Sequence, residues 1–484
     1  MLRLNRRAMI GGLGTAAMMP LIAGAPRAAE TVRQLTVSKR TLEVKGRAAS
    51  VYSLTGENGK PGLEFLVEER FRVNLRNDSD AATLIHWHGL TPPNDQDGVP
   101  MLSQPVLQPG RSYDYDFPNR HAGTHWMHSH VGLQEQQLLA APLIVRETTK
   151  PLFDTQEHVV LLHDFTFRDP QEILAELTGG GGAHAGHSMP KAETGTEMDH
   201  SKMDGMSTDG MAMPGMLNDV AFDAYLANDR TLADPEVVAV EKGGVLRLRI
   251  INGAAASNMW IDLGSLEGEL IAVDGNAIHP VAGSLFPLAI AQRADIRIRI
   301  PKEGGSFPVL FRPEGILERT GIILATSGAT ISRIAGEGEM PPVVDLSQEL
   351  IYRAVAKLRD EPIHRTELVM LTGGGADYVW GLNGKSGMHD TIFSVREGER
   401  LGVIMHNMTG MAHPMHLHGH YFKVVAINGT AIDGAIRDVV LVPLGQSVTV
   451  MFDADNPGNW AFHCHHAYHM NSGMMGKITY TSAA

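Results

Sequence analysis

His463-Cys464-His465 stands near the C-terminus of the 484-residue chain, with His469 and Met474 just downstream. Cys464 is the only cysteine, so the chain can form no internal disulfide. Successive side chains of a strand point to opposite faces, and Cys464 therefore faces away from the two histidines beside it. A thiolate, two histidines and a long axial methionine are the ligands of a blue copper site. The tripeptide can thus serve two metal sites back to back, joined by a covalent path.

Four His-x-His pairs occur in the chain, two near each end: His86-Trp87-His88, His128-Ser129-His130, His416-Leu417-His418 and His463-Cys464-His465. Residues i and i+2 of a strand share a face, so both imidazoles of a pair can reach the same metal cluster. A single pair often reflects only a polar strand face, which does not account for four. Eight neutral imidazoles suit about three copper ions and exceed the four ligands of a structural zinc. We therefore expect the two ends of the chain to meet around a shared metal cluster.

His413 is the expected second histidine of the blue copper site. It precedes His416 by three residues, so it lies on the opposite face of the strand, the face that Cys464 also takes. The predicted ligands are His413, Cys464 and His469, with Met474 in the axial position.

Asp97 follows the first pair closely, within Gln96-Asp97-Gly98. A carboxylate near bound oxygen species can pass protons, whereas a turn before glycine also favours aspartate, and both interpretations stay open. His420 and His466 stand beside expected ligands and are predicted to orient them.

A similar pattern of a charged or glycine turn, a strand and a final asparagine recurs three times, over residues 67–77, 240–252 and 395–407. Within the first, Phe71, Val73 and Leu75 alternate with polar residues, which is typical of a strand with one wet face. Repeats this far apart, with 52 glycines and 26 prolines for turns, predict an all-β protein of three homologous domains. The predicted ranges are 30–150, 151–340 and 341–484. A short helix is expected over 171–177.

The N-terminal segment 1–29 is predicted to be an export signal. Arg6-Arg7 precedes an apolar run that ends near Ile22, which indicates the twin-arginine type and a periplasmic destination. That run is too short to span a membrane, and no other stretch is long and apolar enough. The formal net charge of −13 argues against a nucleic-acid partner.

The segment 178–216 differs from the rest of the chain. It is rich in glycine, methionine and histidine, and it has few large aliphatic residues and no aromatic one, so we expect no packed core there. Thioether sulfur is soft and prefers Cu(I), which favours a flexible copper-gathering loop over a polar linker.

With these residues assembled, the chain resembles the multicopper oxidases. The resemblance implies three cupredoxin-like Greek-key β-sandwiches and four copper ions: one type 1, one type 2 and two type 3. Carried over from the family, the type 2 ligands are His86 and His416, and the two type 3 sets are His88, His128 and His465 and then His130, His418 and His463.

Within the family, the chain is similar to periplasmic copper-resistance oxidases of the copper-resistance protein A type, through Gly132-Leu133-Gln134-Glu135-Gln136, through the Tyr468-His469-Met470 stretch and through the Met/His-rich insert. Some cuprous-oxidising relatives have an acidic residue directly after the last type 1 histidine. Met470 occupies that position here, which favours a thioether-lined entry for Cu(I).

The expected activity is one-electron oxidation of a donor coupled to four-electron reduction of dioxygen to water. Electrons would pass from Cys464 to His463 and His465. The expected donor is Cu(I), whose oxidation would confer copper tolerance. A laccase-like phenol oxidase would share every copper ligand, and a non-catalytic periplasmic copper-binding protein would be expected to lack some.

Overall fold

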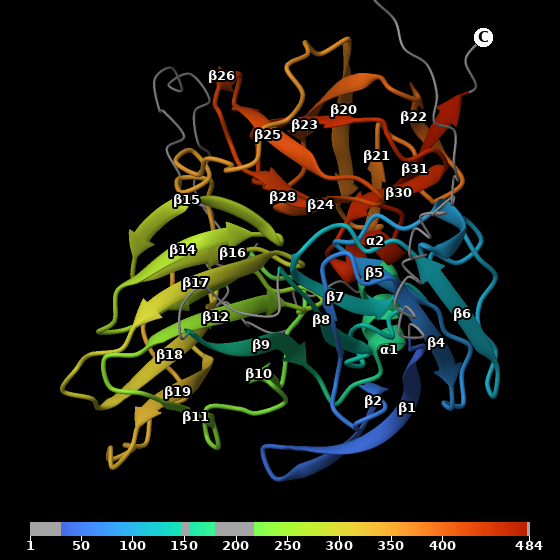
Figure 1. Ribbon diagram of the computed structural model, residues 1–484. Coiled ribbons are helices and arrows are strands. Elements are labelled where there is room, and N and C mark those ends of the chain that lie inside the picture. The colour runs from blue at the N-terminus through green and yellow to red at the C-terminus, as the bar shows by residue number, and fades with distance from the viewer. Residues whose placement is uncertain (1–30, 148–154, 180–216, 482–484) are drawn as a thin grey trace, which may run out of the picture.

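The computed structural model describes residues 31–147, 155–179 and 217–481. The predicted signal 1–29 and nearly all of the 178–216 insert lie outside these ranges. The described chain is almost entirely strands, gathered into three bodies that Figure 1 shows in blue, in green to yellow and in orange to red. Within the described part, no helix has the length and apolar character needed to cross a membrane.

The first sandwich has two four-stranded sheets, in the orders β2-β1-β4-β6 and β3-β8-β7-β5. Its strands are β1 (Arg33–Val44), β2 (Arg47–Gly56), β3 (Leu63–Leu66), β4 (Phe71–Asn77), β5 (Ile85–His88), β6 (Ser112–Phe117), β7 (Gly123–Ser129) and β8 (Ala140–Arg146).

The second sandwich pairs a six-stranded sheet, β10-β9-β12-β17-β14-β15, with a five-stranded one, β11-β19-β18-β13-β16. Its strands are β9 (Thr155–Phe165), β10 (Ala224–Ala227), β11 (Glu236–Val240), β12 (Val245–Asn252), β13 (Met259–Asp262), β14 (Gly268–Val273), β15 (Asn276–Gly283), β16 (Leu285–Leu288), β17 (Arg293–Arg299), β18 (Ser306–Pro313) and β19 (Thr320–Thr326).

The third sandwich has the order β21-β20-β23-β29-β25-β26, with β27 beside β25, facing β22-β31-β30-β24-β28. Its strands are β20 (Arg365–Gly374), β21 (Val379–Leu382), β22 (Thr391–Arg396), β23 (Arg400–Asn407), β24 (His413–Leu417), β25 (Phe422–Ile427), β26 (Thr430–Ala431), β27 (Ile436–Arg437), β28 (Val439–Val442), β29 (Ser447–Asp453), β30 (Asn459–Cys464) and β31 (Met475–Thr481).

Three short helices complete the described chain: η1 (Asn94–Gln96), α1 (Pro170–Thr178) and α2 (Ala467–Asn471). The predicted helix over 171–177 is confirmed as α1. It begins where the Asp169 side chain accepts the Gln171 N–H, with Pro170 at its first position.

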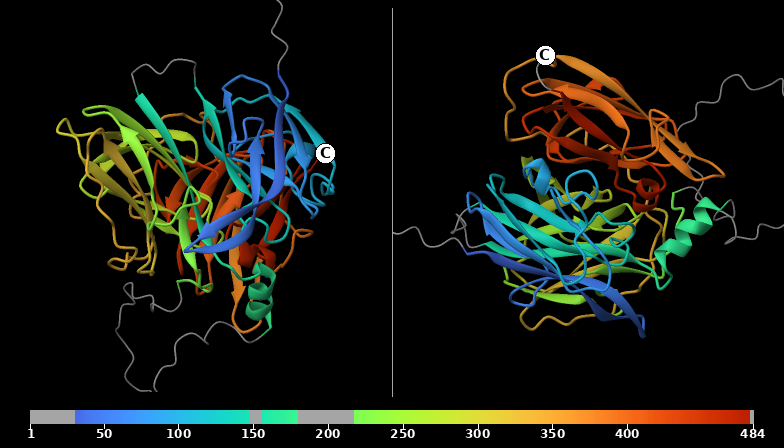
Figure 2. Two further views of the ribbon diagram at one scale, coloured as in Figure 1. Left: turned by 90° about the horizontal axis from the view of Figure 1, so that it is seen from below. Right: turned by 90° about the vertical axis from the view of Figure 1, so that its right-hand side faces the viewer.

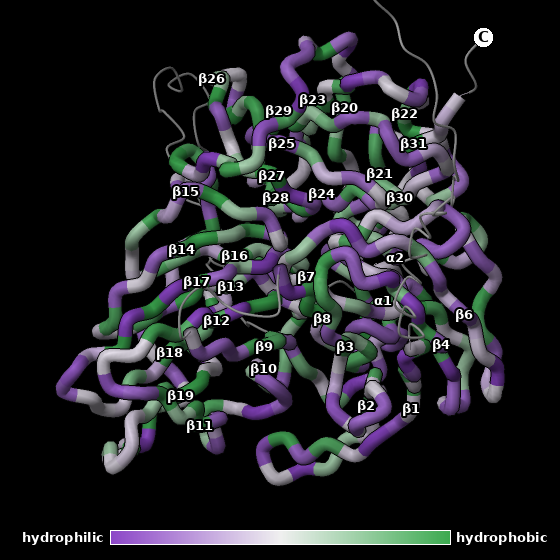
Figure 3. The backbone as a smooth tube through the Cα atoms, in the orientation of Figure 1, coloured by the Kyte–Doolittle hydropathy of each residue, from purple (hydrophilic) through white to green (hydrophobic). Residues whose placement is uncertain are grey.

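Apolar residues that alternate along the strands form the core between the sheets. Phe71, Val73 and Leu75 of β4 are fully buried, whereas Arg72 and Asn74 between them are not. Figure 3 shows the same alternation as changes of colour within single strands such as β4 and β12. The all-β prediction is confirmed.

The three sandwiches share one topology, and the three sequence repeats mark its equivalent strands. Each repeat strand, β4, β12 and β23, runs parallel to the first long strand of its sandwich, β1, β9 and β20. Each ends at an asparagine, Asn77, Asn252 or Asn407. The three asparagines make the same bonds, with Nδ2 donating to two backbone carbonyls and Oδ1 accepting the N–H two residues on.

The same equivalence places the histidine pairs. In the first sandwich they lie on β5 and at the end of β7, and in the third on the equivalent strands β24 and β30. His86 pairs with His128 in the β5–β7 register, and His416 pairs with His463 in the β24–β30 register. The two further views in Figure 2 show the first and third sandwiches against each other. The predicted domain boundaries themselves remain predictions.

Candidate metal centre

One candidate site consists of His413 on β24, Cys464 at the end of β30 and His469 in α2. Cys464 Sγ lies 3.5 Å from His413 Nδ1 and 3.9 Å from His469 Nδ1, and the two nitrogens are 3.2 Å apart. All three side chains are fully buried. His413 therefore lies on the same side of the sheet as Cys464, as strand parity predicts.

The outer nitrogens of both imidazoles have partners. His413 Nε2 contacts the Thr409 hydroxyl at 2.6 Å, and His469 Nε2 lies 3.2 Å from Asp219 Oδ2. With Nε2 engaged, each ring presents Nδ1 to the thiol, which is the arrangement that orients imidazoles as metal ligands.

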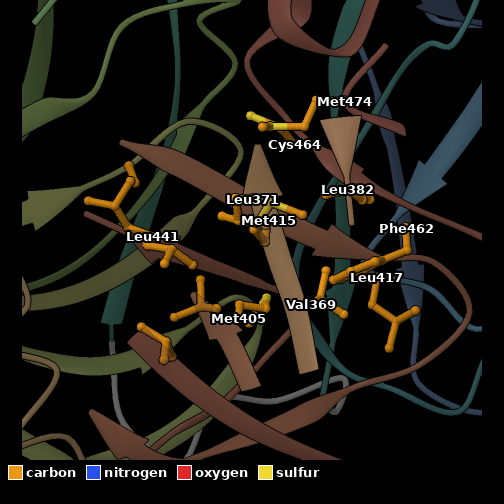
Figure 4. Close-up of a cluster of buried hydrophobic side chains, with 14 of the residues drawn as sticks. Val369, Leu371, Leu382, Met405, Met415, Leu417, Leu441, Phe462, Cys464 and Met474 are labelled. Carbon is orange, nitrogen blue, oxygen red and sulfur yellow. The ribbon is translucent and has the colours of Figure 1, made fainter. Parts of the chain in front are cut away.

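Met474 and two rings close the remaining sides. The Cys464 N–H donates to Met474 O at 3.0 Å, and Figure 4 shows the two side chains beside each other at one end of the apolar core of the third sandwich. The Trp380 ring lies 4.0 Å from the His469 ring on one side, and the His466 ring stacks 3.7 Å from it on the other. His466 is therefore in contact with the ring that it is predicted to orient.

Burial makes this site unfavourable for charge unless a cation is bound. It raises the pKa of the Cys464 thiol and lowers the pKa of His469 to about 4. A neutral thiol among neutral imidazoles is ready to exchange its proton for a soft metal ion. The donor set of two nitrogens, one thiol and a thioether fits copper.

The second candidate site contains all four histidine pairs, between the first and third sandwiches. Each of its eight imidazoles is at least 93% buried, since the most exposed, His130, has 7% of its surface accessible. Pairs of Nε2 atoms from the two sandwiches approach closely: His86 and His416 at 3.5 Å, His128 and His465 at 3.3 Å, and His130 and His463 at 3.4 Å. His418 Nε2 lies 3.0 Å from His463 Nε2.

These separations fit shared metal ions. Two nitrogens bound to one ion at about 2 Å and tetrahedral angles lie roughly 3.3 Å apart. Burial also lowers the pKa of His463 to about 3 and the pKa values of His130 and His465 well below the usual range, so the nitrogens of these three rings are free for a metal at neutral pH. His88 is the exception in geometry: its buried Nδ1 has no hydrogen-bond partner, and its Nε2 lies 3.2 Å from Asp438 Oδ1. Nδ1 is therefore the nitrogen of His88 that no hydrogen bond occupies.

The two sites are adjacent along β30, because Cys464 is covalently bonded to His463 and His465. The His463 Nδ1–H donates to Cys464 O at 2.9 Å, which adds a hydrogen-bonded link to the covalent one. The first and last parts of the chain thus meet where the sequence predicted.

Asp97 lies inside the second site rather than only in a turn. Its side chain is 1% exposed, and its Oδ2 accepts from His418 Nδ1 at 2.8 Å. Its backbone carbonyl accepts from His86 Nδ1 at 2.8 Å. The predicted orienting residue His420 lies nearby, with Nδ1 3.0 Å from His418 O.

Three carboxylates at the sites were missed by sequence reasoning. Glu135 Oε2 lies 2.9 Å from His128 Nδ1, Asp438 contacts His88, and Asp219 contacts His469. Glu135 is five residues after the second pair and offered a weak local signal. Asp438 and Asp219 lie far in sequence from His88 and His469, and only the tertiary structure brings each carboxylate to its imidazole.

Met470 contacts a small apolar cluster with Val99, Ala461 and Met475. The residue that touches the outer edge of His469 is the carboxylate Asp219, contributed by the second sandwich.

Comparison with known proteins agrees with this geometry. Multicopper oxidase family models match residues 36–150, 156–329 and 360–484. The multicopper oxidase MmcO of Mycobacterium tuberculosis is 30% identical over 96% of this chain and 90% of its own, and copper resistance protein A of Escherichia coli is 24% identical over 92% and 91%.

Among solved structures, Fet3p, described as a multicopper oxidase that functions in iron import, has a TM-score of 0.75 at 16% identity over 92% of this chain and 90% of its own. The multicopper oxidase of Pseudomonas thermotolerans has a TM-score of 0.70 at 22% identity over 94% and 100%. These likenesses confirm the predicted cupredoxin-like fold, and the family models together with the relative of 30% identity show that the chain belongs to the multicopper oxidase family.

Proposed function

We propose that this multicopper oxidase takes its electrons from Cu(I) and thereby protects the cell from copper. The four copper ions of the family supply one-electron oxidation at the type 1 ion and reduction of dioxygen to water at the other three. The chain's own residues hold these ions, connect the two sites, and select the donor.

The proposed ligand sets are those of the family, and the short Nε2–Nε2 distances of His86 to His416, His128 to His465 and His130 to His463 support them. The type 1 ligands are His413, Cys464, His469 and Met474. The type 2 ligands are His86 and His416. The type 3 ligands are His88, His128 and His465 for one ion, and His130, His418 and His463 for the other. In the catalytic role, Cys464 carries electrons to His463 and His465, and Asp97 passes protons to the oxygen-binding cluster.

The observation that carries the Cu(I) proposal is where the Met/His-rich insert leaves and rejoins the described chain. Before it, Ile173 and Leu177 of α1 pack in the same apolar core as Trp380, beside His469. After it, Val220 packs in that core too, and Asp219 contacts His469 Nε2. The residues that follow this segment, which is rich in soft sulfur ligands, therefore contact His469 directly, and the helix before it packs in the same core.

Asp219 gives the entry a negative charge. Contacts with His466 and His469 hold the pKa of its carboxyl well below the usual range, so it is ionised at neutral pH. A carboxylate at the edge of His469 attracts a cation such as Cu(I). The same carboxylate is placed to accept the proton of a phenol, which is the observation in favour of a laccase-like donor.

Oxygen consumption with Cu(I) and with a phenol separates these donors. The copper-loaded full chain and a variant lacking 180–216 would be compared at equal blue absorption, which counts intact type 1 sites. We expect the deletion to lower Cu(I) turnover at low donor concentration about tenfold or more and to leave phenol turnover within twofold. An equal effect on both donors, or none, would contradict the Cu(I) proposal. A chain that binds copper but consumes no oxygen with either donor would indicate a non-catalytic copper-binding protein.

We also propose that residues 1–29 direct export to the periplasm by the twin-arginine route. The paired arginines and the short apolar run support it. Arg6→Lys with Arg7→Lys should keep the full-length chain in the cytoplasmic fraction, and unchanged export of that variant would contradict the route.

A further inference from the structure

Two aspartates, Asp97 and Asp438, occupy corresponding places in the metal cluster. The backbone carbonyl of Asp97 accepts from His86 Nδ1 at 2.8 Å, and its carboxylate accepts from His418 Nδ1 at 2.8 Å. The backbone carbonyl of Asp438 accepts from His416 Nδ1 at 2.8 Å, and its carboxylate accepts from His88 Nε2 at 3.2 Å.

The pattern is a reciprocal exchange between sandwiches. Each aspartate uses its carbonyl for the first histidine of its own sandwich's His-x-His pair and its carboxylate for the second histidine of the other sandwich's pair. The spacing from pair to aspartate differs, because Asp97 follows His88 by nine positions in the printed sequence and Asp438 follows His418 by twenty. Only the folded structure therefore shows the correspondence.

The two aspartates differ in their charge partners. Asp438 receives a bidentate ion pair from Arg293 of β17, with both Nη–Oδ distances at 2.5 Å. Arg293 is fully buried, and its Nε donates to Thr124 O of the first sandwich at 3.1 Å. Among the described residues, the ion-pair contacts of Asp97 are with imidazoles. One side chain of the second sandwich thus links the first and third sandwiches at the cluster.

A carboxylate that accepts the Nε2–H of His88 leaves Nδ1 with its lone pair, and this Nδ1 is buried without a partner. The carboxylate can stay ionised in that buried position only because Arg293 compensates its charge. Partners of this kind set the tautomer and the ring orientation of metal-binding imidazoles, and their loss typically weakens metal binding 10- to 100-fold.

We propose that Asp438 and Arg293 are a positioning pair that holds His88 with Nδ1 toward the metal cluster. In the second sandwich, β13 and β18 occupy the places of the strands that carry the histidine pairs in the other two, but they carry no histidine. The second sandwich takes part in the copper centre through Arg293 instead. The proposal rests on the proposed ligand role of His88.

The test compares copper content and spectra of full-length variants. The wild type is measured first: four copper ions per chain and the magnetic signature of a coupled type 3 pair test the ligand assignment by itself. Asp438→Ala and Arg293→Met should then bind copper at the cluster about 10- to 100-fold more weakly and lose the coupled signature. They should keep the blue type 1 absorption, which reports a folded third sandwich.

Asp295→Asn is the matched control. Like Asp438, Asp295 is buried and paired with arginines, in this case Arg247 and Arg249. It also accepts a hydrogen bond from Thr124 of the first sandwich. These bonds of Asp295 are to two arginines and a threonine, whereas Asp438 also bonds to an imidazole of the cluster. It should retain four copper ions and an unchanged type 3 signature. Equal copper loss in this control would overturn the positioning role, because it would show that weakening any contact between sandwiches is enough to release copper.

A double variant separates positioning from simple charge burial. Asp438→Leu with Arg293→Met removes both buried charges, so it should recover thermal stability relative to Arg293→Met. It should not recover the type 3 signature, because His88 Nε2 has no acceptor. Recovery of that signature, or single variants with four copper ions and unchanged spectra, would overturn the proposal.

Discussion

At the residue scale, the blue site depends on the chemistry of one sulfur. Cys464 is the only thiol in the chain, and burial raises its pKa, so a bound cation is needed to keep it as a thiolate. Its two neighbours in sequence are imidazoles of the other site. A substitution here should therefore separate electron entry from the cluster that reduces dioxygen.

Cys464→Ser tests this separation. A serine hydroxyl is a hard, weakly acidic ligand, so we expect loss of the blue absorption and loss of donor oxidation, by about a thousandfold or more. Copper at the three-ion cluster should remain, measured as copper per chain and by electron paramagnetic resonance. A blue, active serine variant would refute the assignment of Cys464.

The buried imidazoles also predict how the copper-free protein responds to acid. The pKa of His469 is about 4 and that of His463 about 3, whereas unfolded histidines titrate near 6.5. The unfolded chain therefore binds more protons below about pH 6.5, and the native state loses stability as pH falls from there toward 4. Each such histidine contributes up to about 1.4 kcal/mol per pH unit. Denaturant unfolding of copper-free protein between pH 7 and 4.5 measures it, and a flat profile would contradict the expected burial.

At the scale of elements, the sequence predicted the strands and which face of a strand each histidine takes, because alternation with a period of two is visible in a short stretch of sequence. It did not predict Asp438, Glu135 or Asp219 as partners of imidazoles. The contacts of Asp438 and Asp219 arise between strands or sandwiches, so no spacing in the chain indicates them, and Glu135 offered only a weak local signal. For Asp97, the sequence left open a role as a turn residue before glycine. That role does not account for its contacts with His86 and His418.

The three strand-ending asparagines allow a matched comparison. Asn252→Ala and Asn407→Ala each remove two donated bonds and one accepted bond, so each should cost roughly 2–4 kcal/mol of unfolding free energy. Only Asn407 also holds Thr409, whose hydroxyl contacts His413 Nε2. Asn407→Ala should therefore shift the blue absorption, and Asn252→Ala should not. A shift in both would contradict a local role for Asn407.

Gly89, directly after the first pair, tests the close packing around Asp438. Its φ is +93°, and a Cβ there would lie 2.5 Å from His125 Nδ1 and 2.6 Å from Arg293 Nη2. Gly89→Ala should therefore displace Arg293 and weaken the type 3 signature while the blue absorption persists. Spectra indistinguishable from those of the wild type would contradict the tight geometry.

At the scale of the whole molecule, the three sandwiches share one topology but contribute different residues to the two sites. The first and third sandwiches supply the imidazoles, and the second supplies Arg293 and Asp219 to the two sites. The resemblance to multicopper oxidases predicted this architecture from the four His-x-His pairs and the Cys464 motif. The contribution of the second sandwich could not be predicted, because neither residue lies in a motif.

Diffraction data from copper-loaded crystals, collected at the copper absorption edge, test the shared cluster most directly. We predict four anomalous peaks: one beside Cys464, and three between the first and third sandwiches, each contacted by imidazoles from both. Peaks confined to one sandwich, or no cluster joining His86 and His128 to His416 and His465, would contradict the account.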